Sequence, residues 1–363
     1  MQLFQCDHCL NPAYFDNTRC SHCGHHLGFE PENLKILSLS QEDEGVFTAI
    51  ATSKKYRYCA NNHHNVCNWI VPYHHSSRFC LACSLNRTIP NLSRSSFLER
   101  WKVIEAAKHR LVYALLRWNL PIKSKSEDPN NGLAFDFKSD EGAPNGQRVL
   151  TGHASGLITM NIAEADDVER EMAKNQMDEV YRTVLGHFRH EIGHYYWDIL
   201  IRNSSQLESY RLIFGDERSS YQEALDKHYR LGAPKNWKEH YISPYASVHP
   251  WEDWAETWAH YLHMVDTMET AYSFGLTIQP KVSFPGDSMG TNMTVDAYNK
   301  TGFDEIFAQW LPLTFVMNSL NRSMGAKDLY PFFINNSVKE KLKFIHHVVN
   351  GYSRDGQGTQ MKR

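Results

Sequence analysis

The stretch His187-Phe-Arg-His190-Glu191-Ile-Gly-His194 contains the pattern H-E-x-x-H. On an α-helix, His190 and His194 lie one turn apart and project from the same face. Two imidazoles at that spacing can hold one Zn²⁺ ion with bonds of about 2.0–2.1 Å. Glu191 follows the first histidine and leans toward a water on the metal, which is the arrangement of a general base in zinc-dependent hydrolysis.

The residues around this motif support a long helix. Apolar side chains recur at spacings of three and four, as in an amphipathic helix, and the set comprises Met177, Val180, Tyr181, Val184, Leu185, Phe188 and Ile192. Asp166 and Asp167 precede the run and are candidate caps for its first turn. The alternative is a core or solvated helix with two incidental histidines, and the sequence context favours a catalytic zinc helix over it.

The length and composition indicate an ordinary globular chain with two domains. The 363 residues are many for one core, and hydrophobic residues make up 42% and charged residues 22% of them. The net charge of −3 argues against a chain that coats nucleic acid or an anionic membrane. We expect neither a signal peptide nor a membrane span, which needs an apolar run of roughly 18–20 residues. The expected location is therefore cytoplasmic, without a membrane partner.

All eight cysteines lie before residue 84, and the first four form two C-x-x-C pairs. Two such pairs at short separation are a strong zinc signal, because each turns two thiolates toward one metal and four complete a closed tetrahedral site. The predicted ligands of this first structural zinc are Cys6, Cys9, Cys20 and Cys23. Two disulfides are the alternative, and they fit a cytoplasmic chain poorly.

The other cysteines predict a second structural zinc site, whose ligands are Cys59, Cys67, Cys80 and Cys83. The last two again form a C-x-x-C pair, whereas the first two frame a longer loop. Replacement of one cysteine by His63 or His64 is the alternative ligand set. Both sites would help this region to fold, because the free energy of metal binding becomes free energy of folding.

Residues 54–110 carry ten Lys or Arg and two acidic residues. A zinc ribbon with a basic surface can bind nucleic acid. A Zn–Cys₄ centre, however, has a formal charge of about −2, and nearby cations offset that charge. We therefore do not expect nucleic acid as a partner, and the candidate partner of the ribbon region is a protein.

Between the cysteines and the motif, the sequence predicts one long helix and a small sheet. The helix is indicated by Phe97, Trp101, Ile104, Leu111, Leu115 and Trp118, and Asn119-Leu-Pro121 ends it. Residues 149–153 and 156–162 are predicted strands around a tight turn at Ala154-Ser155. We expect the second strand to lie at an edge, where it can pair with an extended substrate.

A third metal ligand is predicted on a later helix that begins near Pro250. Glu252 and Glu256 share one face of this helix, and a His₂Glu site needs a carboxylate from a second helix. We take Glu252 as the ligand and Glu256 as the acceptor that orients one of the two histidines. Asp198, one turn beyond His194, is the rival ligand, but a straight helix cannot easily wrap three successive turns around one tetrahedral ion.

Together these motifs resemble the gluzincin metallopeptidases, in which H-E-x-x-H is followed by a later helix with E-x-x-A-E. The resemblance implies that Glu252 is the third zinc ligand. In the anthrax lethal-factor type, a tyrosine that stabilises the transition state stands seven residues before that glutamate, and Tyr245 has this offset here. Many gluzincins have Asn before the ligand glutamate, where this chain has Trp251. The partner of the other histidine is therefore open, and Asp198 is a candidate.

Over nearly its full length, the chain is similar to a bacterial group of zinc-dependent metallopeptidases with an N-terminal zinc ribbon. The stretches that carry this similarity are residues 6–23, 80–90, 186–198, 249–256 and 320–325. With the distribution of cysteines, it implies an α+β fold in three parts. These are a zinc-ribbon region at residues 1–92, a mainly helical zincin-like domain with a small sheet at residues 93–350, and a flexible tail at residues 351–363.

The expected function is hydrolysis of peptide bonds in a peptide or protein substrate, with zinc as the cofactor in one catalytic and two structural sites. Zinc activates a water, Glu191 takes its proton and later passes it to the leaving nitrogen, and Tyr245 donates a hydrogen bond to the developing oxyanion. His249 is a weaker candidate for that donor. One alternative is a zinc-ribbon interaction module whose metal helix binds without catalysis, and another is a hydrolase of non-peptide amides.

Overall fold

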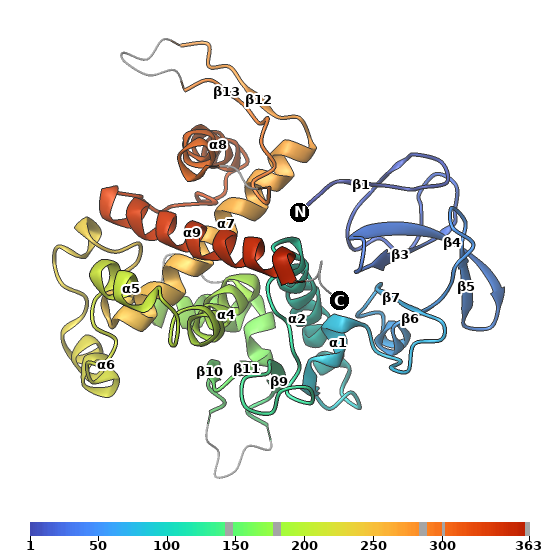
Figure 1. Cartoon of the computed structure of the whole chain (residues 1–363), viewed down its shortest axis with the longest axis horizontal. Coiled ribbons are helices and arrows are strands. Elements are labelled where there is room, and N and C mark those ends of the chain that lie inside the picture. Colours follow the sequence, from blue (N-terminus) through green and yellow to red (C-terminus); the bar gives the residue numbers. More distant parts are fainter. Residues whose placement is uncertain (142–147, 177–182, 283–288, 300–301, 360–363) are drawn as a thin grey trace. The chain divides into compact units, whose positions relative to one another are not determined.

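The computed structural model describes residues 1–141, 148–176, 183–282, 289–299 and 302–359 (Figure 1). The chain forms two compact units. One comprises Met1–Ala173 and Thr183–Phe188, and the other comprises Lys174–Arg182 and Arg189–Arg363. A cysteine-rich region with small sheets precedes a helical domain, so the predicted α+β class is confirmed. The domain boundaries at residues 92 and 350 stay predictions.

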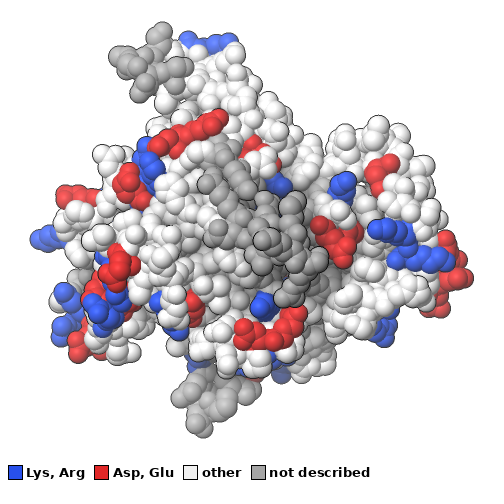
Figure 2. Space-filling view, in the orientation of Figure 1, with Lys and Arg blue, Asp and Glu red and all other residues white. Residues whose placement is uncertain are grey.

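Basic and acidic side chains are intermixed on the face drawn in Figure 2. Within residues 54–110, seven of the ten cations have a carboxylate partner, and the pairs are Lys55–Glu42, Arg87–Asp136, Arg94–Glu141, Arg100–Asp166, Lys102–Glu99, Lys108–Glu105 and Arg110–Asp16. Arg57 instead donates hydrogen bonds to backbone carbonyls of the loop at residues 73–77. Much of this positive charge therefore has a partner within the chain, and the expectation that nucleic acid is not bound stays a prediction.

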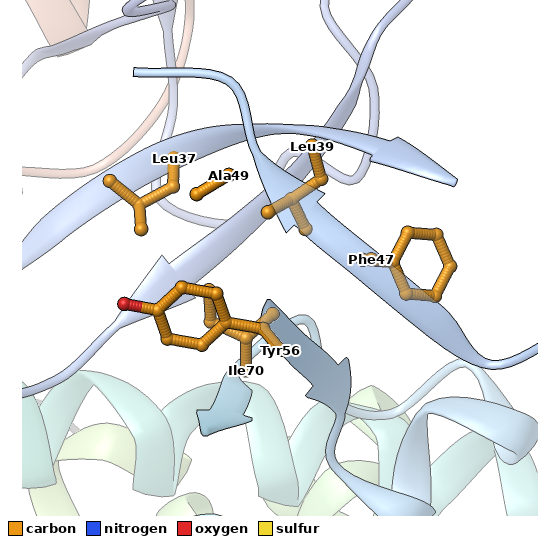
Figure 3. Packing of buried hydrophobic residues seen from close by; sticks show 6 residues of the cluster. All are labelled: Leu37, Leu39, Phe47, Ala49, Tyr56 and Ile70. Atoms are coloured by element: carbon orange, nitrogen blue, oxygen red, sulfur yellow. The ribbon is translucent and has the colours of Figure 1, made fainter. Parts of the chain in front are cut away.

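The ribbon region is built on a five-stranded antiparallel sheet in the order β3-β4-β5-β6-β7. Its strands are β3 (His26–Glu30), β4 (Lys35–Asp43), β5 (Val46–Ala49), β6 (Lys55–Tyr58) and β7 (Ile70–Pro72), and β1 (Phe4–Gln5) pairs separately with β2 (Pro12–Ala13). One hydrophobic cluster (Figure 3) packs on the sheet, and it consists of Leu37, Leu39, Phe47, Ala49, Tyr56 and Ile70. Each large side chain buried there contributes roughly 1.5–3 kcal/mol of transfer free energy.

A second sheet of the same unit has the order β10-β11-β9-β8. β8 (Asn86–Thr88), β9 (Ala134–Lys138) and β11 (Leu157–Asn161) run parallel, and β10 (Gly152–Ala154) pairs antiparallel with β11. The prediction of an edge strand at residues 156–162 is therefore wrong, because β11 has a neighbour on each side. The predicted turn is present, and Ser155 and Gly156 adopt φ angles of 49° and 81° there.

The long helix of this unit is α2 (Ser95–Arg117), which follows the short α1 (Leu81–Ser84). Trp101, Ile104 and Leu111 are fully buried on one face of α2, as their spacing predicts. The helix ends where the sequence indicates, and Asn119 adopts a left-handed φ of 53° there. Two 3₁₀ turns, η1 (Ala60–His64) and η3 (Ile162–Ala165), lie in the same unit.

The helix of the H-E-x-x-H motif is α4 (Val184–Leu200). Thr183 caps it, because its hydroxyl accepts a hydrogen bond from Gly186 N (2.9 Å). Asp166 instead caps the separate helix α3 (Asp167–Gln176), where it accepts from Val168 N (3.0 Å). The predicted caps Asp166 and Asp167 are therefore wrong for the motif helix, and residues 177–182 of its predicted run lie outside the described residues.

The second unit is assembled around α7 (Pro250–Ser273), whose Trp254, Trp258 and Tyr261 are fully buried. Its other elements are α5 (Leu207–Phe214), α6 (Tyr221–Leu231), η4 (Trp237–Glu239), η5 (Tyr245–Ser247), β12 (Thr277–Ile278), β13 (Thr291–Asn292), α8 (Phe303–Ser323) and α9 (Asn336–Thr359). α9 is tied to α7 by the buried ion pair between Lys341 and Asp253 (2.6 Å).

α9 continues to Thr359, so most of the predicted tail at residues 351–363 is helical, and its flexibility stays a prediction. Residues 360–363 lie outside the described residues. Within the ranges that the structure describes, no helix combines the length and the apolar composition that a membrane crossing requires.

The contribution of a buried charge to the stability of the first unit can be tested at Asp136. This fully buried carboxylate on β9 pairs with Arg87 (2.5 Å) and Lys138 (2.9 Å). Burial acts to raise the pKa of Asp136, but its pairs with Arg87 and Lys138 outweigh burial and lower that pKa to about 2. The pairing should therefore contribute about 2 kcal/mol above pH 5, and this contribution should disappear as the pH falls through 2.

Asp136→Asn should thus lower the free energy of unfolding by about 2 kcal/mol at pH 7. Its difference from wild type should shrink as the pH falls from about 5 toward 2. Urea unfolding of both proteins at each pH measures this. Glu99→Gln, at an exposed ion pair with Lys102, is the control and should cost less than about 1 kcal/mol. A loss independent of pH would contradict the ion-pair account.

Candidate metal centre

Two helices of the second unit bring His190, His194 and Glu252 together. α4 presents the histidines from successive turns, and α7 presents Glu252 from its first turn, where the helix dipole favours a carboxylate. His190 Nε2 lies 3.0 Å from Glu252 Oε2 and 3.2 Å from His194 Nε2. The third distance, from His194 Nε2 to Glu252 Oε2, is 3.4 Å. We call these three donor atoms the ligand triangle.

The close approach of α4 and α7 depends on Gly193, which lies inside the motif. A Cβ atom at this position would lie 3.0 Å from Ala255 Cα and 3.2 Å from Trp258 Cβ, so a larger residue would push the helices apart. Trp254 Nε1 donates a hydrogen bond to the Gly193 carbonyl (2.8 Å) and fastens the same crossing. The separation of the two histidines from Glu252 is therefore set by backbone packing.

The ligand triangle fits a tetrahedral zinc ion. With bonds of about 2.0–2.1 Å, neighbouring ligands of such an ion lie about 3.3–3.4 Å apart. His190 Nδ1 lies 2.7 Å from Glu256 Oε1, so its proton points to that carboxylate and the Nε2 lone pair points into the triangle. Glu252 Oε2 is buried and accepts no hydrogen bond from the described residues. Electron pairs thus converge on one point, and a cation there would stabilise them.

The charges around the triangle favour the same conclusion. Ser243 donates a hydrogen bond to Glu256 Oε2 (2.6 Å), so both oxygens of Glu256 have partners. Burial acts to lower the pKa of His190, but Glu252 and Glu256 outweigh it and raise that pKa well above its usual value. Burial acts to raise the pKa of Glu252, yet the two imidazoles hold it well below its usual value. The negative electrostatic potential that favours a proton between these side chains also favours a divalent cation there.

Glu191 is buried beside the ligand triangle, with 9% of its surface exposed. It does not belong to the ligand group. Burial raises the pKa of its carboxyl, and the neighbouring His190 and His194 act in the opposite direction. A carboxylate with a raised pKa takes up a proton more readily, which is the property that a general base requires.

Two tyrosines lie near Glu252. Tyr245, the predicted donor, lies in η5 with its ring centroid 6.0 Å from that of His190. Tyr221 on α6 donates a hydrogen bond from its hydroxyl to Glu252 Oε1 (2.7 Å), and the sequence analysis missed it. It stands 31 residues before Glu252 on a polar helix, where no motif marks it. Burial raises the pKa of both tyrosines, so both hydroxyls stay protonated.

His249, the weaker candidate for the donor role, is engaged in other contacts, and that role stays a prediction. Its Nε2 donates to the Ser219 carbonyl (3.1 Å), and its Nδ1 accepts from Trp251 N (3.1 Å). Both ring nitrogens are therefore occupied by contacts that fix the start of α7. An oxyanion would have to displace the Ser219 contact to reach this imidazole.

Asp198 is not brought to the ligand triangle. Its carboxylate forms an ion pair with Arg202 (2.6 Å), one turn further along α4. Among the described residues, the ligand group at this centre consists of His190, His194 and Glu252. Asp198 as the partner of His194 stays a prediction.

The eight cysteines form two groups of four, and in each group the sulfur atoms lie within 4.8 Å of one another. The Sγ–Sγ distances are 3.6 Å for Cys6–Cys23, 3.6 Å for Cys9–Cys20 and 3.7 Å for Cys67–Cys80. A disulfide requires about 2.05 Å, whereas two thiolates on one tetrahedral zinc lie about 3.8 Å apart. The geometry therefore fits two closed zinc sites, and all eight thiols are free. Neither His63 nor His64 belongs to the second group.

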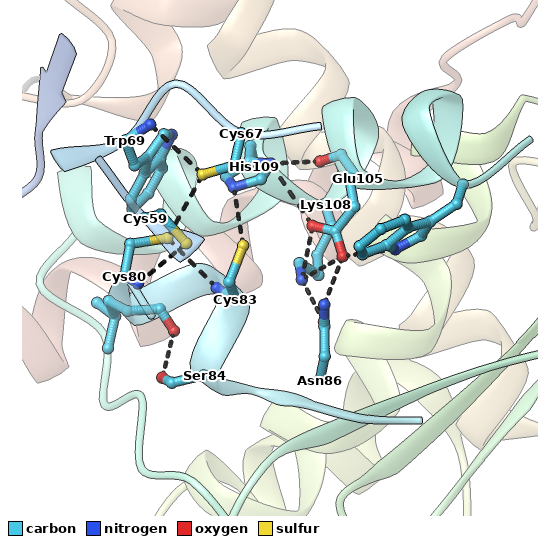
Figure 4. Close-up of polar contacts among 12 residues, drawn as sticks. Cys59, Cys67, Trp69, Cys80, Cys83, Ser84, Asn86, Glu105, Lys108 and His109 are labelled. Carbon is cyan, nitrogen blue, oxygen red and sulfur yellow. Dashed lines mark hydrogen bonds and ion pairs between the residues drawn. The ribbon is translucent and has the colours of Figure 1, made fainter. Parts of the chain in front are cut away.

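The second cysteine group packs against α2 through a buried polar network (Figure 4). His109 Nε2 lies 3.7 Å from Cys83 Sγ, and its Nδ1 donates to the Glu105 carbonyl (2.7 Å). Burial acts to lower the pKa of His109, but Cys83 and Glu105 outweigh it and raise that pKa. Lys108 is fully buried and contacts both Glu105 (2.8 Å) and Asn86. An imidazole and the buried ion pair between Lys108 and Glu105 therefore lie beside the second cysteine group.

A cysteine-rich ribbon followed by a helical domain, in which two histidines and a glutamate converge, is typical of a zinc-binding metallopeptidase. The chain belongs to the family described as "Putative zinc-binding metallo-peptidase", whose model matches residues 97–348. A model described as "zinc-ribbon domain" matches residues 3–94.

The chain is also similar to uncharacterized proteins of Mycobacterium bovis and of two strains of Mycobacterium tuberculosis. Each is 40% identical over 364 residues, and the alignment covers 100% of this chain and 99% of the relative. No solved structure matches the chain. The similarity therefore extends through both the ribbon region and the helical domain.

Metal analysis tests the assignment of ligands. We expect about three zinc ions per chain, one in each site, and we expect Glu252→Ala to lose one of them. Asp198→Asn is the matched control and should retain all three, because Asp198 faces Arg202. Elemental analysis after dialysis against a weak chelator measures the number of zinc ions per chain. Full retention of zinc by Glu252→Ala would contradict the ligand triangle. Loss of zinc from Asp198→Asn would indicate that Asp198 is a ligand.

Proposed function

We propose that this protein is a zinc-dependent peptidase of the gluzincin type, with Glu191 as the general base of peptide-bond hydrolysis. The observation that carries the proposal is the ligand triangle with a buried glutamate beside it. Zinc held by His190, His194 and Glu252 would supply a Lewis acid and lower the pKa of a water. Membership of the zinc-binding metallopeptidase family supports the coarser assignment.

The chain's own side chains move protons and orient the ligands. Glu191 accepts a proton from the attacking water and delivers it to the leaving nitrogen, for which its raised pKa suits it. Glu256, held by Ser243, keeps the His190 proton on Nδ1, so that Nε2 is available as a ligand. Tyr245 donates a hydrogen bond to the substrate oxygen as negative charge develops on it.

We further propose that the two cysteine groups hold structural zinc, which makes one catalytic and two structural ions per chain. Four thiolates around one ion leave no open position for a water, so these sites are suited to stabilising the ribbon region. Reduced thiols fit a cytoplasmic location. The surface of the ribbon region remains a candidate for contact with a protein partner.

Glu191→Gln should retain the metal and the fold but lose activity. Glutamine has nearly the same shape and cannot accept the proton, so kcat should fall by a factor of about 10²–10⁴. Comparison of peptide termini in cells that contain wild-type protein or the variant identifies substrates. Kinetics on a peptide identified in this way then measure kcat and KM.

Glu208→Gln is the matched control, because Glu208 is an exposed glutamate on α5 paired with Arg211. It should leave both kcat and KM unchanged. A Glu191→Gln variant that cleaves as fast as wild type would exclude the mechanism. Wild-type protein that holds its zinc and cleaves no peptide would instead favour an interaction module whose metal helix binds without catalysis.

Tyr245→Phe tests the proposed oxyanion donor. Loss of one such donor lowers kcat by a factor of about 10²–10³, and KM and zinc content should change little. Tyr272→Phe, at a partly exposed tyrosine on α7, should behave as wild type. An unchanged kcat in Tyr245→Phe would remove this residue from the mechanism.

A further inference from the structure

The two oxygens of Glu252 have different partners. Oε2 lies in the ligand triangle, 3.0 Å from His190 Nε2 and 3.4 Å from His194 Nε2. Oε1 accepts the hydrogen bond from the Tyr221 hydroxyl at 2.7 Å. Only 2% of Glu252 is exposed, so bulk water has little access to replace the tyrosine. The carboxylate is therefore held with one oxygen toward the histidines and the other turned to Tyr221.

Tyr221 is set in place by contacts with the start of α7. His249, the cap of α7, donates from Nε2 to the Ser219 carbonyl (3.1 Å). Ser220 caps α6 by accepting from Glu223 N (3.4 Å). The Tyr221 ring packs edge-on against the His249 ring, with centroids 5.4 Å apart. Two attachments, at residues 249 and 252, thus join the beginning of α6 to the first turn of α7.

α6 contributes no fully buried residue to the second unit. Its first residue nevertheless directs a hydroxyl at one of the most buried carboxylates in the described chain. A hydroxyl that completed a hydrophobic core would stand on a buried helix face, which α6 does not have. The place of Tyr221 is better explained by its partner, the proposed metal ligand.

We propose that Tyr221 is a positioning residue that restricts Glu252 to a single ligating oxygen and so reserves a coordination position for water. This inference rests on the zinc site proposed above. A carboxylate can hold a metal with one oxygen or with two, and a released Oε1 is free to turn toward the metal position. A hydrolytic zinc site needs three protein ligands and one open position. A second carboxylate oxygen would join the water as a fifth ligand, crowd that position and weaken the bond between the water and the ion.

The test replaces Tyr221 by Phe in the full-length protein and substitutes Co²⁺ for the ion that a weak chelator removes. The visible absorption of Co²⁺ reports its coordination, because five-coordinate ions absorb more weakly than four-coordinate ones. At equal cobalt content, Tyr221→Phe should absorb more weakly than wild type and at shifted wavelengths. On a peptide substrate its kcat should fall about 10–100-fold, with KM little changed. Superimposable cobalt spectra would overturn the proposal.

Tyr229→Phe is the matched control, because it removes a hydroxyl from an exposed position of the same helix. It should give the wild-type spectrum and the wild-type kcat. Charge transfer from sulfur to cobalt in the near ultraviolet reveals cobalt in the cysteine groups, so spectra are compared in samples without that band. If Tyr221→Phe folds poorly, the same experiment is carried out with Tyr221→Met, which removes the same hydrogen-bond donor.

The spectral comparison needs no substrate, so the failure of this inference differs from failure of the proposed function. If wild-type protein cleaves no peptide while the two cobalt spectra differ, the positioning role stands and the peptidase assignment falls. If wild-type protein cleaves peptides while the spectra coincide, the peptidase assignment stands and the positioning role falls.

Discussion

Three electron-pair donors that face one another within 3.4 Å are the constraint on which the second unit depends. Two imidazoles and a carboxylate at low exposure repel or compete for protons unless a cation lies between them. α4 and α7 hold these donors in place for two reasons. Gly193 has no side chain, so Ala255 can approach closely, and the tryptophans of α7 bury large apolar surfaces. Zinc binding would then contribute directly to the stability of the same helix pair.

The sequence could predict that His190, His194 and Glu252 come together, because the spacing within each helix is local. His190 and His194 stand four residues apart on one helix, and Glu252 and Glu256 do so on another, so one turn of helix explains each pair. Tyr221 could not be predicted, since its place depends on α6 folding back to a residue 31 positions later. The same limit applies to the role of Asp198, whose pairing with Arg202 competes with any approach to the histidines.

The fold shows the same division between local and distant signals. The apolar spacing predicted α2 and its end, and the clustering of the cysteines, three C-x-x-C pairs among them, predicted both groups of four. The start of α4 was missed because Asp166 and Thr183 are both good cap residues, and only the structure shows that another helix intervenes. β11 was misplaced at an edge because its second neighbour is β9, a parallel partner more than 20 residues earlier in the chain, and no local pattern reveals that pairing.

Within the first unit, packing links the second cysteine group to Phe188, near the start of the motif helix. Lys108, one residue before the histidine that contacts Cys83, has its Nζ 5.7 and 5.5 Å from the ring centroids of Phe135 and Phe137. Those rings in turn contact Phe188 edge-on, with centroids 5.6 and 6.2 Å away. Phe188 lies two residues before the first histidine of the motif. Because protein interiors are close-packed, a metal ion in this cysteine group would support the packing around Phe188 within the first unit.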